Sequence, residues 1–503
     1  MQMIILVCSK ISQASIQASL GKPEYSYYFL LKEFLPALER FAQVVVLDSV
    51  ADVDRLYHHY SEAGETVVFL SVSPPHQTPV GLDCPTVCLF AWEFDSLPDQ
   101  PWDGEPRNDW RHVFRHVAGA ICTSRETQQL VERSAPSFPV AAIPAPVWDH
   151  YAHLMEAEGH LPLLDARYFS FTGYLVDSAI LGLSADGLVP ETKHLAPENN
   201  PSHEVVREDC TPPQKAPNFW NLCKRLYQDW RNELALPRAP RSCTNPLSQD
   251  AADVADMAVP GQPAVPAGVL FTQTPLNLQV TGVVYTTLLN PADSRKNWTE
   301  ILTAFCWAFK DEAEATLVVK MTHYDLEYYR IVLITLLSRL SPFKCRVLVV
   351  HGFLDERQYQ ELIRATSYYV NASSGEGLCL PLMEFLSAGC PALAPTHTAM
   401  ADYIRGSLAF TVDCSREPFC WPHDPSGIYV THRHRLNWAS LVAAFRESFR
   451  VAREEPERYR AMSQSAYTQL QGFASQHQVA QQLSGFILAL DSARVSDKRQ
   501  GTT

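Results

Sequence analysis

Short apolar runs alternate with helical patterns along the first 150 residues. The runs are four or five residues long and do not alternate strictly between polar and apolar positions, which is typical of strands covered on both faces. They lie at 4–8, 44–47, 66–70, 86–90, 119–123 and 140–143. Helical patterns separate them at 27–40, 53–62, 110–116 and 125–133. This alternation predicts a doubly wound parallel sheet of the α/β class.

The same rhythm returns after residue 282. Strands are predicted at 283–288, 316–320, 347–350, 368–371 and 391–394. Helices are predicted at 298–310, 326–340, 355–365 and 380–388, and three more close the chain at 438–452, 456–470 and 477–490. Two such units in tandem place a cleft between the carboxyl edges of two sheets, where ligands of these folds bind.

The middle of the chain breaks this rhythm. Residues 181–275 hold 13 of the 36 prolines and offer one helical pattern, at 219–234. We therefore expect an N-terminal domain over 1–150 and a Pro-rich insertion or linker with one docked helix over 151–275. A C-terminal domain follows over 276–475, and 476–503 form a helix that crosses back, with a flexible tail. Partial disorder is the alternative that this composition leaves open for the insertion.

Charge and cysteine usage narrow the class of protein. Lys and Arg number 41 against 55 Asp and Glu, a formal net charge of −14, which argues against nucleic acid as the main partner. The basic run at 432–435 keeps peripheral membrane association open.

The thirteen scattered cysteines are typical of free thiols in a reducing compartment. The apolar start of the chain is too short for a signal sequence. A cytoplasmic protein is expected, of undetermined oligomeric state.

Residues 371–384 carry the clearest chemistry: Asn-Ala-Ser-Ser-Gly-Glu-Gly-Leu-Cys-Leu-Pro-Leu-Met-Glu. A predicted strand ends there and a predicted helix begins, so backbone N–H groups and the helix dipole favour an anion at this junction. Gly375 and Gly377 allow the backbone to approach a ligand closely. Glu376 and Glu384 both face the expected cleft. A loop carboxylate can accept hydrogen bonds from sugar hydroxyls, and a helix carboxylate can bind a ribose diol.

These residues resemble the Glu-x7-Glu motif of family 4 glycosyltransferases, which have the GT-B fold of two Rossmann-like domains facing a cleft. The resemblance continues in Phe-Leu-Ser-Ala-Gly-Cys-Pro at 385–391 and in the basic loop Asp-Ser-Arg-Lys-Asn at 293–297. Trp-Glu-Phe-Asp-Ser-Leu-Pro at 92–98 resembles a segment found in a subset of the family. The match is good over 280–490, loose over 1–150, and absent over 151–275.

The resemblance implies transfer of a hexose from a nucleotide-sugar to a glycan, lipid-linked or protein acceptor, with retention of configuration, as in polysaccharide biosynthesis. Lys296 and Arg295 would neutralise the leaving diphosphate, and Glu384 would hold the ribose. Glu376 would fix the donor sugar together with the N–H groups of Gly377 and Leu378. Ser373, Ser374 and the strand-end Lys320 would reach the phosphates. Neither a metal nor a further cofactor is implied. Residues 396–402 follow a predicted strand and could touch the donor.

Two positions depart from the family pattern. Asn290 stands where many members have an Arg that binds the diphosphate. Trp92 and Glu93 stand in the segment where many members have a His near the donor sugar, and both are candidates for binding the donor or acceptor sugar. Lys22 and Tyr25, in the first strand–helix loop, are further candidates for such contacts.

The substitution at Asn290 keeps open an alternative function, a non-catalytic GT-B module that binds a nucleotide or a glycan. The histidines at 423, 432 and 434 lie close in sequence, but no Cys or acidic residue stands at ligand spacing, so no metal site is predicted from them.

Overall fold

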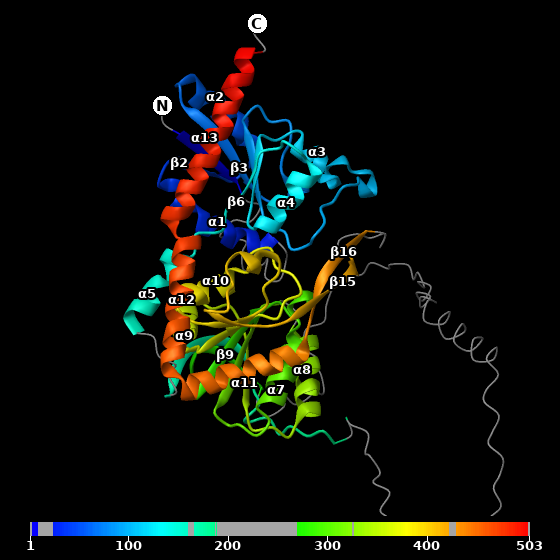
Figure 1. Cartoon of the computed structure of the whole chain (residues 1–503), viewed down its shortest axis with the longest axis vertical. Helices are drawn as coiled ribbons and strands as arrows, with labels where there is room; N and C mark the ends of the chain where they lie inside the picture. Colours follow the sequence, from blue (N-terminus) through cyan, green and yellow to red (C-terminus); the bar gives the residue numbers. More distant parts are fainter. Residues whose placement is uncertain are drawn as a thin grey trace, which may run out of the picture. The chain divides into compact units, whose positions relative to one another are not determined.

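The computed structural model describes residues 3–8, 24–158, 165–186, 188, 269–323, 326–421 and 429–500 (Figure 1). The chain divides into two units, residues 1–189 together with 265–503, and residues 190–264. The second unit lies outside the described residues, and with it the helix expected at 219–234. Both large sheets of the described chain belong to the first unit.

The first sheet consists of six parallel strands in the order β2-β1-β3-β4-β5-β6. They are β1 (Met3–Cys8), β2 (Gln43–Leu47), β3 (Thr66–Val72), β4 (Thr86–Phe90), β5 (Gly119–Cys122) and β6 (Val140–Ala142). Alternate residues of β1 face opposite sides, so Ile5 packs in a core with Phe34 of α1 (Glu24–Glu39), and Leu6 in another with Val53 of α2 (Val53–Glu62). This is the doubly wound sheet predicted from the apolar runs.

Three further helices belong to this half: α3 (Trp110–Phe114), α4 (Arg125–Ser134) and α5 (Trp148–Glu158). The sequence predicted the first two and missed α5. Ser124 caps α4, since its hydroxyl accepts a hydrogen bond from the N–H of Thr127.

The second sheet has eight strands in the order β14-β13-β12-β9-β10-β11-β7-β8. The parallel strands are β9 (Val283–Leu289), β10 (Ala315–Met321), β11 (Arg346–His351), β12 (Tyr368–Val370), β13 (Ala392–Ala394) and β14 (Ala409–Thr411). Val319 packs in one core with Phe305 of α7 (Trp298–Ala308), and Val318 in another with Leu362 of α9 (Glu356–Ala365). Helices therefore cover both faces, and the two sheets are the Rossmann-like pair expected of the GT-B fold.

Two antiparallel strands extend this sheet at one edge. They are β7 (Arg167–Asp177), which pairs with β11, and β8 (Val269–Val280), which pairs with β7. Both begin within the span expected to be an insertion, so part of that span completes the second sheet. The sequence analysis predicted neither strand. In β7 the register shifts between Phe171 and Gly173, which interrupts the alternation of faces that marks a strand.

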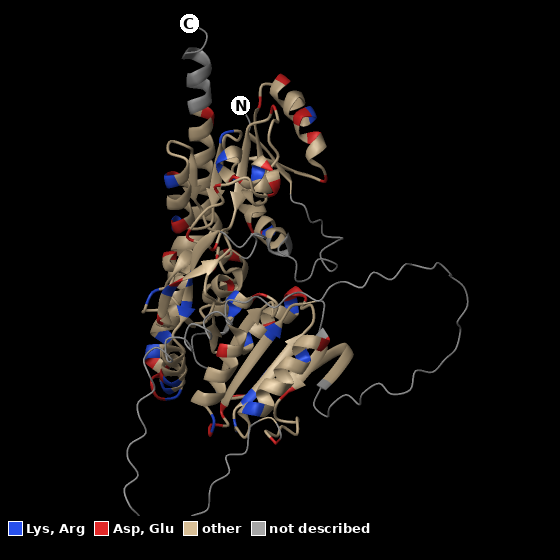
Figure 2. Cartoon of the chain, turned by 90° about the vertical axis from the view of Figure 1, so that its right-hand side faces the viewer, with Lys and Arg blue, Asp and Glu red and all other residues tan. Residues whose placement is uncertain are grey.

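The remaining helices are α8 (Leu326–Leu340), α10 (Leu380–Ser387), α11 (Trp438–Glu454), α12 (Pro456–Ala474) and α13 (Gln476–Gln500). Helix α13 packs on the first sheet, since a methyl group added to Gly119 of β5 would lie 3.0 Å from Leu490 and 3.2 Å from Phe486. None of the helices in the described part of the chain has both the length and the apolar character needed to cross a bilayer. Acidic and basic residues are interspersed over helices and loops, and the two large sheets carry few of them (Figure 2).

Candidate functional site

The loop between β12 and α10, residues 371–379, is almost wholly buried although it is rich in polar groups. Asn371, Ser373, Ser374 and Glu376 are each at most 5% exposed. The side-chain oxygen of Asn371 accepts a hydrogen bond from the N–H of Ser373 at 2.9 Å, which forms a local turn. The loop therefore has a defined conformation, and its polar side chains are directed inward.

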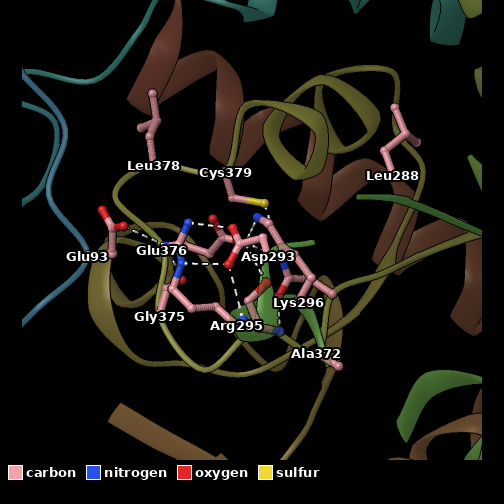
Figure 3. A network of polar contacts seen from close by, with 12 residues as sticks. Glu93, Leu288, Asp293, Arg295, Lys296, Ala372, Gly375, Glu376, Leu378 and Cys379 are labelled. Atoms are coloured by element: carbon pink, nitrogen blue, oxygen red, sulfur yellow. Dashed lines mark hydrogen bonds and ion pairs between the residues drawn. The ribbon is translucent and has the colours of Figure 1, made fainter. Parts of the chain in front are cut away.

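Glu376 and Lys296 form the central ion pair of the site (Figure 3). The Nζ of Lys296 lies 2.6 Å from Oε1 of Glu376, and the same oxygen accepts hydrogen bonds from Ser373 at 2.5 Å and from Asn371 at 3.2 Å. Burial raises the pKa of Glu376, but the charges of Lys296 and Arg295 outweigh burial and hold this pKa at about 2. Burial lowers the pKa of Lys296, and the charge of Glu376 more than restores it. Both side chains are therefore charged at neutral pH.

Arg295 is held from three sides. It lies in the short 3₁₀ helix η7 (Ser294–Lys296), and its Nε and Nη2 lie 3.1 and 2.7 Å from the carboxylate oxygens of Asp293. Its Nη1 donates to the carbonyl oxygen of Gly375 at 3.1 Å and lies 3.0 Å from Oε1 of Glu93 (Figure 3). Burial lowers its pKa, but Glu93 and Asp293 raise it overall. Arg295 thus links the 371–379 loop to the segment after β4.

Two glycines allow this loop to lie against the segment that follows β4. A Cβ atom added to Gly375 would lie 2.9 Å from the carbonyl oxygen of Glu93, and one added to Gly377 would lie 2.9 Å from the nitrogen of Trp92. Real Cβ atoms do not approach a backbone so closely without displacing it, so both positions require glycine in this arrangement. The adjoining Leu378 is buried, and its carbonyl oxygen accepts a hydrogen bond from the hydroxyl of Tyr403 at 2.8 Å.

Glu384 lies on α10, buried, in a different environment. Its carboxylate accepts a hydrogen bond from the hydroxyl of Tyr359, a residue of α9. Burial raises the pKa of Glu384 to about 7, although the bond from Tyr359 lowers it. A change of protonation at this carboxyl group therefore falls near neutral pH.

Lys320, near the end of β10, is buried as well. Its Nζ donates a hydrogen bond to the hydroxyl of Thr322 at 2.7 Å, and burial lowers its pKa to about 8. On the neighbouring strand, burial and the charge of Lys320 together lower the pKa of His351 to about 4. A positive charge at Lys320 is thus costly in this structure.

The structure brings together six of the predicted site residues, since Glu93, Arg295, Lys296, Ser373, Gly375 and Glu376 share one network of hydrogen bonds and ion pairs. Ser374 joins it through its N–H, which donates to the carbonyl of Arg295 at 2.8 Å. The hydrogen bonds given for Lys320 and Glu384 lead to Thr322 and Tyr359 instead. Asn290 lies in the turn before η7, where its side-chain oxygen accepts from the N–H of Ala292 at 3.0 Å.

The other candidates have different positions. Trp92 packs against Trp110 and Trp421, with ring centroids 4.5 and 5.1 Å away, and donates to the carbonyl of Ser96 at 2.8 Å. Lys22 lies outside the described residues. Tyr25 lies on α1, where the side chain is not part of what the structure describes.

The sequence analysis assigned no structural role to several residues that hold the site in shape. Asp293 and Asn371 orient Arg295 and Glu376. Thr398, in η8 (Thr398–Asp402), accepts a hydrogen bond from the N–H of Glu376 at 3.0 Å, within the 396–402 stretch that the sequence placed at the cleft. Among the described residues, no three His, Cys, Asp or Glu side chains are grouped as metal ligands.

No protein-family model matches the chain, and no curated protein does. Solved structures do match over nearly the whole chain. Anabaena HepE in complex with UDP and glucose is 10% identical, with a TM-score of 0.47 over 97% of this chain and 100% of that chain. A glycosyltransferase from Rickettsia africae is 7% identical, with a TM-score of 0.47 over 97% and 98%. Sucrose-phosphate synthase from Thermosynechococcus elongatus is 11% identical, with a TM-score of 0.45 over 98% and 100%. At these values the function has to be inferred from the residues of the site.

Proposed function

We propose that the chain is a GT-B glycosyltransferase of the family 4 type. It would transfer a hexose from a nucleoside diphosphate-sugar to a glycan, lipid-linked or protein acceptor in the cytoplasm, with retention of configuration. The observation that supports this most is the network of Arg295, Lys296 and Glu376, which puts two cations beside a glycine-bearing loop at the start of a helix.

The two cations carry the charge that would stabilise a departing diphosphate. A nucleoside diphosphate gains negative charge as its bond to the sugar breaks, and cations fixed beforehand stabilise that charge best. Arg295 is already fixed by Asp293, so it needs little reorganisation. In this proposal a phosphate oxygen takes the place of Glu376 as partner of Lys296, and the N–H groups at the start of α10 add to the positive field. This arrangement supplies the charge that a metal ion supplies in other transferases.

Glu376 is the proposed ligand of the donor sugar. Its pKa of about 2 keeps it ionised, so it can accept hydrogen bonds from two hydroxyl groups. In this proposal the neighbouring N–H groups of Gly377 and Leu378 make further contacts with the sugar, and the hydroxyl of Ser373 contacts a phosphate. Glu93, held against Arg295, is the proposed residue of the first domain that faces donor or acceptor.

Glu384 and Lys320 complete the proposed donor site. Ribose hydroxyls that donate to the Glu384 carboxylate would stabilise its ionised form and lower its pKa from about 7. A phosphate near Lys320 would likewise stabilise its ammonium form and raise its pKa from about 8. Both groups therefore gain a partner when the nucleotide binds.

A binding screen without metal tests the proposal. Thermal unfolding is followed with UDP, GDP, ADP, TDP and CMP in EDTA, for the wild type, Lys296→Ala, Glu384→Ala and the exposed control Lys344→Ala. A nucleotide at 100 times its Kd adds about 2.7 kcal/mol to the stability of the folded state. We expect one diphosphate to stabilise the wild type and the control, but neither site variant. No stabilisation by any nucleotide would contradict the proposal.

A non-catalytic module that binds nucleotide or glycan is the second candidate, because Asn290 stands where many family members have an Arg. The two candidates differ in turnover. A transferase incubated for long with its nucleotide-sugar releases nucleoside diphosphate by slow hydrolysis, whereas a binding module releases none.

A further inference from the structure

A two-stranded hairpin leaves the second half of the chain after β14. Its strands are β15 (Cys414–Cys420) and β16 (Val430–Leu436), which pair antiparallel from Cys414 opposite Leu436 to Cys420 opposite Val430 (Figure 1). It forms a sheet of its own, separate from both large sheets. Its strands are largely polar, so a hydrophobic core of its own does not explain where it lies.

One side of the hairpin lies on the 371–379 loop. The N–H of His434 donates to the carbonyl oxygen of Ser374 at 2.9 Å. The His434 ring stacks on that of His397, with centroids 4.0 Å apart and planes 6° from parallel. The hairpin thus covers the loop that carries Glu376.

The hairpin is also fastened to the segment after β4. One oxygen of Asp95 accepts hydrogen bonds from the hydroxyl of Thr431 and the N–H of His432, both at 2.9 Å, and the other pairs with Arg416. Burial raises the pKa of Asp95, but these bonds lower it overall, so the carboxylate is ionised and firmly bound. Trp421, directly after β15, packs on Trp92 with ring centroids 5.1 Å apart.

Little space remains beneath the hairpin. Its residues Phe419, His432 and Arg433 form one wall of a cavity that Arg295 and Gly375 close on the other side. The volume of this cavity is about 10 Å³, which is room for about one water molecule. Pockets for drug-sized ligands measure roughly 300 to 1,000 Å³. A nucleotide-sugar cannot enter here unless something moves.

We propose that the β15–β16 hairpin is a gate over the donor site and that Asp95 is its latch. This rests on the proposed function, because it is the donor that the gate admits. Breaking the contacts of Asp95 frees the hairpin from the segment after β4, while its hydrogen bond to Ser374 keeps it attached to the half that binds the nucleotide. The hairpin then opens, the donor enters between Arg295 and the hairpin, and the latch closes over it.

Asp95→Asn tests the latch in the full chain. The amide keeps the size of the side chain and loses the charge that binds Arg416 and the hairpin N–H. Hydrogen exchange of residues 430–436 without ligand, followed by mass spectrometry, reports opening directly. We expect exchange at least about tenfold faster than in the wild type, because a charge-assisted hydrogen bond is lost. Asp99→Asn, an exposed change on the same segment, is the matched control and should exchange like the wild type.

The rate of nucleotide association tests the gate. UDP, GDP and ADP are mixed with each variant in a stopped-flow fluorimeter. We expect association with Asp95→Asn to be faster by about the same factor as exchange, and unchanged with Asp99→Asn. Arg416→Gln, which changes an exposed partner of Asp95, should also make nucleotide association faster, but by a smaller factor.

Three results would overturn the gate. Unchanged exchange shows that Asp95 does not hold the hairpin. Faster exchange with unchanged association shows that the hairpin does not limit entry. Faster exchange with no nucleotide bound by any variant, the wild type included, overturns the proposed function and the gate's role in it, and leaves a latch that closes over something else.

Discussion

Two groups of buried or partly buried charges lie near the carboxyl edge of the second sheet, and they differ in whether a charge of opposite sign lies beside them. In the compensated group, Lys296 pairs with Glu376 at 2.6 Å, and Arg295 pairs with Asp293 at 2.7 Å and with Glu93 at 3.0 Å. In the uncompensated group, Lys320 and Glu384 have hydroxyl partners, and their pKa values are displaced to about 8 and about 7, toward their neutral forms. The two groups therefore differ in what they need from a ligand.

This difference separates the residues that stabilise the site by themselves from the residues that lack a partner of opposite charge until a ligand binds. A buried charge with a partner of opposite sign needs no ligand to be stable, and removing the partner is costly. A buried ionisable group without one favours its neutral form and gains when a ligand brings the missing charge or hydrogen bond. On this view the compensated group keeps the loop in shape, and the uncompensated group would gain most from the proposed nucleotide.

The largest expected effect comes from breaking the compensated pair. Lys296→Met leaves the carboxylate of Glu376, only 5% exposed, without its main partner. Loss of one member of a buried ion pair costs about 3 to 5 kcal/mol. Chemical denaturation at pH 7 should show a loss of this size.

Two variants make this result specific. The exposed change Lys344→Met should leave stability within about 0.5 kcal/mol of the wild type. The double variant Lys296→Met with Glu376→Leu removes both charges and should recover most of the loss, since a buried pair is often replaced by apolar residues at little cost. A loss below about 1 kcal/mol for Lys296→Met alone would show that the pair does not hold the loop.

Much of this frame could be predicted from the sequence. The parallel strands β1–β6 and β9–β13 are short apolar runs that the pattern predicts, and β4 and α2 begin and end where it predicts. The strands β15 and β16 could not be predicted. Their residues are mostly polar and partly exposed, and what fixes them is Asp95, 337 positions before its partner His432. A pattern within a few residues carries no information about such a contact.

Some residues of the candidate site could also be predicted from the sequence, and others could not. The spacing of Glu376 and Glu384 and the Arg295-Lys296 pair could be identified because short stretches carry them. Their partners could not. Asp293 precedes Arg295 by two residues and resembles an ordinary loop acid, and Thr398 reaches Glu376 only through the fold. Sequence could not show that Glu376 is compensated and Glu384 is not, because burial and distance decide this.

Removing the uncompensated lysine, Lys320, should raise the stability of the protein, whereas removing Lys296 lowers it. The pKa of Lys320 falls from 10.5 to about 8 on folding, so each unit of this shift costs about 1.36 kcal/mol while the lysine is charged. Lys320→Met should therefore stabilise the protein by roughly 3 kcal/mol at pH 7.

The pH dependence of stability tests whether Lys320 causes this effect. Between pH 8 and 10.5 the unfolded state binds more protons than the folded state, so the stability of the wild type rises with pH in this window. The advantage of Lys320→Met, measured by denaturation at pH 7 and at about pH 9.5, should shrink to about half or less at the higher pH. If the variant is less stable than the wild type at pH 7, Lys320 has a compensating partner after all. A stabilised variant that no longer binds nucleotide would place Lys320 in the donor site.

Glu384→Gln tests the carboxylate of the uncompensated group, with a somewhat smaller effect. Its pKa rises from 4.5 to about 7 on folding, so the folded state binds more protons between these values and the wild type loses stability as pH rises through them. The amide cannot ionise. Glu384→Gln should match the wild type at pH 5 and exceed it by about 2 kcal/mol at pH 8, somewhat less than the full shift implies because the amide N–H group needs a new partner. Denaturation at both pH values measures this difference. A constant difference between pH 5 and pH 8 would show that Glu384 does not titrate in this range, and the contrast with Glu376 would then be lost.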